Sequence, residues 1–166
     1  MKVLMVYYSR TGVTRKATDK IAELLREAGV EVKAEEIGEA KRRGGFRGWL
    51  GWIRDATRRR TAPIEPVEAD LTAYDLVAVG TPVWAWSAST PVRTFCDSHG
   101  GKAKQVAFYC TMGGSGDKGA FKAMEELCGK TPVATLALIE RHVRKDDEEK
   151  FLAKAKEFAV KIAAAG

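Results

Sequence analysis

The sequence predicts one α/β domain, a doubly wound five-stranded parallel sheet of order 2-1-3-4-5 with helices on both faces. Three continuous apolar runs (Val3 to Tyr8, Leu76 to Gly80 and Val106 to Cys110) are typical of strands that are buried on both faces. Each run is followed by a turn and then by apolar residues at helical spacing. The run from Val30 to Glu35 instead alternates, as a second strand at the sheet edge should.

The first predicted strand leads into the turn Ser9-Arg10-Thr11-Gly12-Val13-Thr14. A helix N-terminus offers free N–H groups and the positive end of the helix dipole, and this turn adds three hydroxyls. The pattern therefore indicates a phosphate site, although it is neither a Walker loop nor a GxGxxG fingerprint. An ordinary turn with Ser and Thr as helix caps is the alternative. The helix is predicted from apolar residues on one face: Ala17, Ile21, Leu24, Leu25 and Ala28.

Residues 38–66 interrupt the alternation of strands and helices, and they contain a short basic amphipathic helix. Residues 41–60 hold eight cations and one anion, a net charge of +7, whereas the rest of the chain has 20 cations and 21 anions. Four interpretations stay open: packing onto the domain, docking of an acidic partner, covering the ligand site, or lying on a membrane surface. The helix is predicted from Phe46, Trp49, Leu50 and Ile53.

Two further turns follow the central strands. Thr81-Pro82-Val83-Trp84-Ala85-Trp86 comes after the third strand, before a helix for which Thr90 is the predicted N-cap. Thr111-Met112-Gly113-Gly114 comes after the fourth strand. The remaining elements are a fifth strand, Val133 to Ile139, and two helices with inner faces made of Ala120, Phe121, Met124, Leu127 and Cys128, and of Phe151, Ala155, Phe158, Ala159 and Ile162.

The turns after strands one, three and four meet at one edge of such a sheet, beside the point where the strand order reverses. One turn suits a phosphate, the second supplies two tryptophans, and the third supplies glycines whose backbone can approach a flat ring closely. This combination predicts a planar, anionic ligand of nucleotide size.

The order and placement of SRTGVT at 9–14, GTPVWAW at 80–86 and TMGGSG at 111–116 resemble the flavodoxin family over nearly the whole chain. The resemblance implies FMN as cofactor, with Trp84 favoured over Trp86 for stacking on the flavin. The implied FMN-binding residues are Ser9, Arg10, Thr11, Gly12, Val13 and Thr14 at the phosphate, Thr81, Pro82, Val83, Trp84, Ala85 and Trp86 along the flavin, and Thr111, Met112, Gly113 and Gly114 on its other side.

The same resemblance implies an electron-transfer protein that passes electrons between redox partners. The basic charge of residues 41–60, in which the chain departs from the family, predicts an acidic partner that docks there. The alternative is an FMN-dependent NAD(P)H oxidoreductase that reduces a quinone, a flavin or another small acceptor. A cofactor-free interaction module is the third hypothesis. No residue is predicted to transfer protons, and Cys110 is interpreted as a small buried apolar residue.

The composition bounds where the protein works and what it binds. No apolar run approaches the roughly 20 residues of a membrane-spanning helix, and no export signal precedes the first strand. Three widely spaced cysteines indicate reduced thiols in the cytoplasm, and two histidines exclude a histidine-rich metal site. We expect neither a metal nor a nucleic-acid partner.

Overall fold

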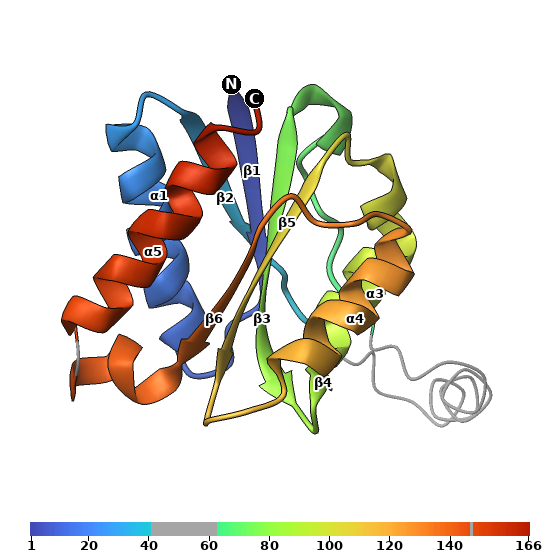
Figure 1. Ribbon diagram of the computed structural model, residues 1–166. Coiled ribbons are helices and arrows are strands. Elements are labelled where there is room, and N and C mark those ends of the chain that lie inside the picture. The colour runs from blue at the N-terminus through green and yellow to red at the C-terminus, as the bar shows by residue number, and fades with distance from the viewer. Residues whose placement is uncertain (41–62, 147) are drawn as a thin grey trace.

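The structure is a computed structural model that describes residues 1–40, 63–146 and 148–166, with the backbone alone for residues 145 and 146. The predicted helix from Phe46 to Ile53 and the basic residues 41–60 lie outside the described residues. The described chain forms three layers, with a twisted sheet between two pairs of helices (Figure 1).

The elements alternate along the chain as predicted. The strands are β1 (Lys2–Tyr7), β2 (Glu31–Glu36), β3 (Leu76–Trp84), β4 (Ser87–Ala88), β5 (Val106–Met112) and β6 (Thr135–Ile139). The helices are α1 (Val13–Glu27), α3 (Thr90–His99), α4 (Asp117–Cys128) and α5 (Glu148–Ala163). Short helical turns comprise Leu71–Ala73, Gly100–Lys102 and the π-helical His142–Asp146.

The sheet has the order β2-β1-β3-β5-β6, and all four of these neighbouring pairs are parallel. The predicted order 2-1-3-4-5 is therefore confirmed when the five parallel strands are numbered along the chain. β4 is an addition that pairs antiparallel with the end of β3. The segment predicted as a turn from Thr81 onward is thus the arm of a β-hairpin.

Each face of the sheet is covered by one pair of helices. α1 and α5 lie on one face and bury Ile21, Leu25 and Phe158 against β1 and β5, whereas α3 and α4 bury Phe95 and Met124 on the other. All five residues predicted for the inner face of the last helix are buried. The two apolar layers explain why the central strands are apolar without alternation.

Several boundaries differ from the sequence predictions. Ala28 is exposed because α1 has already ended. The N-cap of α3 is Ser89, one residue before the predicted Thr90. The fifth parallel strand begins at Thr135 instead of Val133, and β5 extends through Met112, so its turn starts at Gly113. These shifts of one to two residues are where local patterns are least decisive.

The residues on either side of 41–62 pair with one another. Ala40 N–H donates to the Pro63 carbonyl at 3.2 Å, and Glu65 N–H donates to the Gly38 carbonyl at 2.8 Å. These bonds form a short antiparallel stem beside the end of β2.

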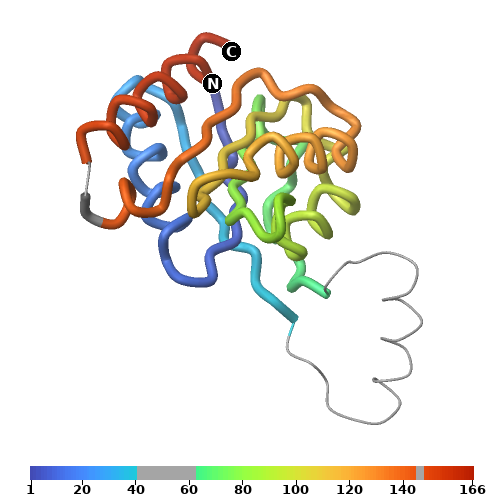
Figure 2. Tube along the Cα trace, turned by 60° about the horizontal axis from the view of Figure 1, so that its bottom comes forward, coloured from blue at the N-terminus to red at the C-terminus, as the bar shows by residue number. Residues whose placement is uncertain are grey.

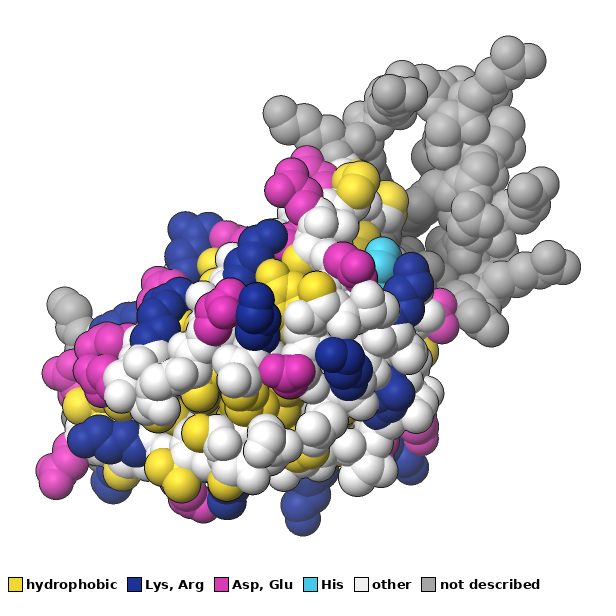
Figure 3. Space-filling view, turned by 90° about the horizontal axis from the view of Figure 1, so that it is seen from above, with side chains coloured by type: hydrophobic (Ala, Val, Ile, Leu, Met, Phe, Trp, Pro, Cys, Tyr) yellow, Lys and Arg dark blue, Asp and Glu magenta, His cyan; other side chains and the backbone are white. Residues whose placement is uncertain are grey.

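Both chain termini lie at the amino end of the central strands, opposite the edge where the three turns were predicted. On that end, charged side chains of both signs are mixed with apolar ones (Figure 3). Every helix in the described ranges is too short or too polar to traverse a lipid bilayer.

Candidate functional site

The turns after β1, β3 and β5 lie together at the carboxyl edge of the sheet, which faces forward in Figure 2. The register places Tyr7, the last residue of β1, beside Gly80 of β3, and Gly80 beside Tyr109 of β5. This parallel alignment brings the three predicted segments into one region, at the point where the strand order reverses.

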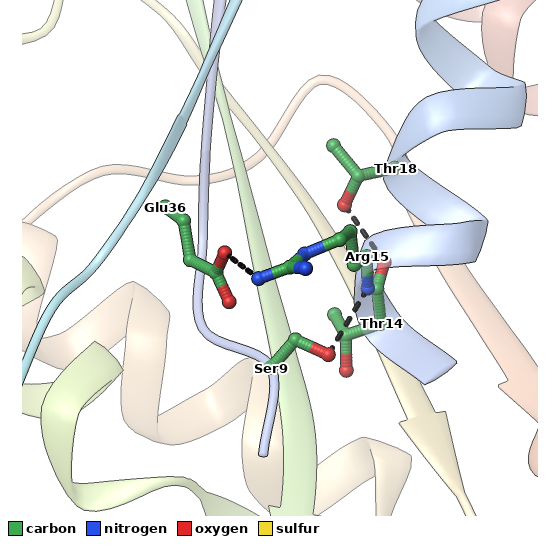
Figure 4. A network of polar contacts seen from close by, with 5 residues as sticks. All are labelled: Ser9, Thr14, Arg15, Thr18 and Glu36. Carbon is green, nitrogen blue, oxygen red and sulfur yellow. Dashed lines mark hydrogen bonds and ion pairs between the residues drawn. The ribbon is translucent and has the colours of Figure 1, made fainter. Parts of the chain in front are cut away.

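The first turn leaves the N-terminus of α1 open. Gly12 is the N-cap, with φ of 83° and no side chain to cap the helix. The Ser9 hydroxyl accepts a hydrogen bond from the Arg15 N–H at 3.2 Å (Figure 4). No protein acceptor is found for the N–H groups of Val13 and Thr14 within the described part of the chain. The exposed hydroxyl of Thr11 borders the same space.

The Arg15 side chain is paired with a carboxylate of the neighbouring strand β2. Its guanidinium forms an ion pair with Glu36 at the end of β2 (Figure 4). Arg10 remains exposed, and its guanidinium carbon lies 6.0 Å from the centre of the Trp84 ring.

Buried hydroxyl groups connect α1 with β5 beneath the turn. The Thr14 and Thr111 hydroxyl oxygens are 2.9 Å apart, and both side chains are buried. The Thr18 hydroxyl donates to the Thr14 carbonyl at 2.8 Å and lies 2.7 Å from the Tyr109 hydroxyl. The hydroxyls of Thr14 and Thr111 therefore hold the two elements together. Both residues belong to segments predicted to bind the ligand, and that assignment stays a prediction.

The second segment is a hairpin with a strained tip. Ala85 and Trp86 have φ values of 47° and 60°, the left-handed conformation that a two-residue type I′ turn requires and that glycine or asparagine usually provides. At its base, the Ser89 N–H donates to the Thr81 hydroxyl at 2.9 Å, and the two hydroxyls are 3.1 Å apart. Thr81 and Pro82 are buried, and the Thr81 hydroxyl fixes the base of the hairpin.

The two tryptophans of the hairpin have different surroundings. The Trp84 ring meets the edge of Tyr8 at 5.6 Å between centroids and an interplanar angle of 86°, and it is partly buried. Trp86 is 73% exposed. Trp84, flanked by Tyr8 and Arg10, is held in place by the turn that precedes α1.

The third segment, which follows β5, begins with two exposed glycines, and glycines further along the chain lie against the hairpin. Gly113 and Gly114 are exposed, and a Cβ atom at either position would meet no atom within 4 Å. Gly116, the N-cap of α4, and Gly119 lie against the hairpin, where an added Cβ would collide with Val83 and with the Trp86 carbonyl. Met112 is buried at the end of β5.

Tyr8 links the site to the stem that flanks residues 41–62. Its hydroxyl donates to the Glu39 carboxylate, and its side chain is 6% exposed. Burial, with the hydrogen bond to Glu39 as the second cause, raises the pKa of Tyr8 to about 12. Neither residue was singled out from the sequence, because nothing in the local pattern of either segment indicates the contact.

We expect Tyr8→Phe to flatten the decline of stability at high pH. Between its ordinary pKa of 10 and about 12, the folded chain keeps a proton that the unfolded chain has lost, so the free energy of unfolding falls as pH rises. Below pH 10 both states are protonated and this contribution is fully present. Urea denaturation across that range, with Tyr74→Phe as the control, measures the slope; equal slopes in wild type and Tyr8→Phe would contradict the contact.

Cys110 has the character predicted for it. Its side chain is fully buried, and burial raises the pKa of its thiol to about 12. Cys96 and Cys128 are buried as well, and all three thiols are free. No group of three or more histidine, cysteine, aspartate or glutamate side chains suited to a metal occurs among the residues placed by the structure.

The geometry can be compared with known proteins. The model of the flavodoxin family matches residues 46–155, about two thirds of the chain. The chain belongs to the flavodoxin family. Among solved structures, this flavodoxin-family chain is similar to a flavodoxin from the domain Archaea, with a TM-score of 0.66 and 18% identity, over 99% of this chain and 97% of that one.

Two other solved structures share the fold. The likeness to a flavoprotein from Lactobacillus acidophilus in complex with FMN has a TM-score of 0.64 and 24% identity, and covers 82% of this chain and 92% of that one. The likeness to flavodoxin 1 from Bacillus cereus has a TM-score of 0.64 and 17% identity, and covers 99% of this chain and 98% of that one. At these identities the likeness establishes the flavodoxin-like fold.

Curated relatives carry another name. The chain is 32% identical over 114 residues to an NAD(P)H dehydrogenase (quinone) from Bradyrhizobium diazoefficiens, covering 69% of this chain and 54% of that protein. It is 29% identical over 119 residues to the protein of the same name from Afipia carboxidovorans, with the same coverage. The chain thus spans about half the length of the curated relatives it matches.

Proposed function

We propose that this flavodoxin-family chain binds FMN and passes electrons between redox partners. The observation that carries the proposal is the convergence of three features at one sheet edge: the open N-terminus of α1, the tryptophan hairpin and the exposed glycines after β5. A nucleotide with a phosphate at one end and a flat ring at the other suits this arrangement.

The residues present fit FMN. Some of them would contact it directly and others would support the site, a distinction that the sequence did not indicate. The phosphate would be held by the backbone N–H groups of Val13 and Thr14 and by the hydroxyls of Ser9 and Thr11. The hairpin from Val83 to Trp86 and the backbone of Gly113 and Gly114 would enclose the ring. The hydroxyls of Thr14, Thr81 and Thr111 are engaged in buried contacts, so they would support the site from behind.

Bound FMN would supply one- and two-electron redox chemistry, which belongs to the cofactor. The protein binds, orients and shields it. The buried position of Thr81 and the packing of Gly116 and Gly119 against the hairpin fix the ring-facing segment. Cys110, fully buried with a raised pKa, offers no thiolate to a reacting atom.

The alternative proposal is an FMN-dependent NAD(P)H oxidoreductase that reduces a quinone, a flavin or another small acceptor. The name of the curated relatives favours it. The 73% exposed side chain of Trp86, at the tip of the hairpin, also supports it, because a second planar substrate could stack on it.

One experiment separates the hypotheses. The purified protein is mixed with FMN, and its visible spectrum and flavin fluorescence are recorded before and after adding NADH or NADPH without air. Flavin bands that stay oxidised support the carrier, and rapid bleaching supports the oxidoreductase. A protein that leaves the spectrum and fluorescence of added FMN unchanged would contradict both.

For the partner, we propose an acidic redox protein that docks through residues 41–60. The support is the sequence itself, whose net charge of +7 in this stretch contrasts with −1 elsewhere. Replacing Arg58, Arg59 and Arg60 by glutamate should slow electron transfer and reduce its dependence on ionic strength. Electron transfer that is salt-independent in the wild type and unchanged in the variant would contradict docking by this stretch.

A further inference from the structure

The π-helical turn His142–Asp146 lies beside the first turn, although the two are far apart in the chain. Val143 is 1% exposed and packs in the same apolar cluster as Val13 and Ala17. The Lys16 ammonium donates to the Arg144 carbonyl at 3.3 Å. The backbone of this turn is thereby anchored to α1 on both its apolar and its polar side.

This anchoring brings the Arg144 guanidinium to the first turn. Its Nη2 donates to the Thr11 hydroxyl at 3.4 Å and lies 3.6 Å from the Glu140 carboxylate. The side chain is about half exposed, at 53%. A guanidinium carries five N–H donors, and these two contacts both involve Nη2, so most of its donors remain for a ligand.

The other described cations near the turn have different contacts. Arg15 is paired with Glu36, Arg10 lies over Trp84, and Lys16 donates to the Arg144 carbonyl. Among these four cations, Arg144 is the one whose charged group donates to a hydroxyl of the first turn.

We propose that Arg144 is a phosphate-recognition residue that makes this chain select FMN over riboflavin. The inference rests on the proposed function and deepens it. A planar guanidinium matches a phosphate in two parallel charge-assisted hydrogen bonds, and it adds a positive charge that the neutral N–H and hydroxyl donors of the turn do not carry. Glu140 competes for the same guanidinium, so the carboxylate weakens the site.

The test measures dissociation constants of FMN and riboflavin by quenching of flavin fluorescence. Arg144→Gln should raise the constant for FMN about tenfold or more, the usual scale for a lost hydrogen bond to a charged group, and leave riboflavin unchanged. The matched control is Arg141→Gln, which also removes one positive charge, three residues earlier in the chain. Arg141 is exposed and contacts His142 instead of the first turn, so FMN affinity should stay close to wild type.

Glu140→Gln provides a change of opposite sign. It frees the guanidinium and removes a negative charge near the phosphate, so FMN should bind a few-fold more tightly while riboflavin is unaffected. In the Arg144→Gln background this gain in FMN affinity should shrink, because the guanidinium for which Glu140 competes is no longer there. The salt dependence of FMN binding should also weaken in Arg144→Gln.

The outcomes separate the two proposals. The role of Arg144 would be overturned, with FMN binding intact, if Arg144→Gln weakened the affinity for FMN and for riboflavin equally. It would also be overturned if Arg144→Gln and Arg141→Gln changed the FMN affinity by the same factor. A wild-type protein that binds neither flavin would overturn both.

Discussion

Gly119→Ala is expected to destabilise the protein by about 1–3 kcal/mol, the usual cost of an overpacked contact. In an open helix the same change would stabilise by roughly 0.5–1 kcal/mol. The sign reverses here because a Cβ at this position, in the first turn of α4, would lie far inside van der Waals distance of the Trp86 carbonyl oxygen. Trp86 cannot retreat easily, since its backbone already has a positive φ.

Urea denaturation gives the free energy of unfolding, and FMN titration gives a second measurement. A displaced hairpin should weaken FMN binding in Gly119→Ala. Gly101→Ala is the matched control, because its Cβ would have an ordinary neighbour at 4.0 Å; we expect a change within about 0.5 kcal/mol there. A Gly119→Ala variant as stable as the wild type would contradict the close contact between α4 and the hairpin.

Gly80→Ala should cost about 2–3 kcal/mol, because it overpacks the centre of the sheet. The new Cβ would lie 2.5 Å from the Tyr109 hydroxyl oxygen and closer still to its ring. Tyr109 is fully buried, packs at 6.1 Å from Phe158, and has its hydroxyl 2.7 Å from that of Thr18. Moving the ring would break these contacts, so the strain cannot be relieved cheaply.

A double-mutant cycle with Tyr109→Leu tests the cause. The smaller side chain leaves room for the Cβ, so the two changes together should cost about 1–2 kcal/mol less than their separate effects summed. Additive costs would show that Gly80→Ala acts elsewhere, for example through the strand itself. Both single variants and the double variant are measured by urea denaturation at one pH.

The candidate site shows how much can be predicted from residue types alone. Ser, Thr and Gly after a strand correctly indicated where the three segments would meet, because chain order and periodicity determine which strand ends are neighbours. The interior contacts of individual hydroxyls could not be predicted in this way. Thr14, Thr81 and Thr111 are hydrogen-bonded in the interior, and a threonine in a buried contact has the same local sequence signature as one that faces a ligand.

The sequence by itself determined the alternation of elements, the parallel sheet and its order, and the faces that each helix buries. Apolar runs and helical spacing are local patterns, and burying them leaves few arrangements. Only the tertiary structure decided the hairpin at Ala85 and Trp86, the bond from Tyr8 to Glu39, and the position of Arg144 beside Thr11. These depend on side chains that are far apart in the chain, and their contacts exist only once the sheet and helices have brought them together.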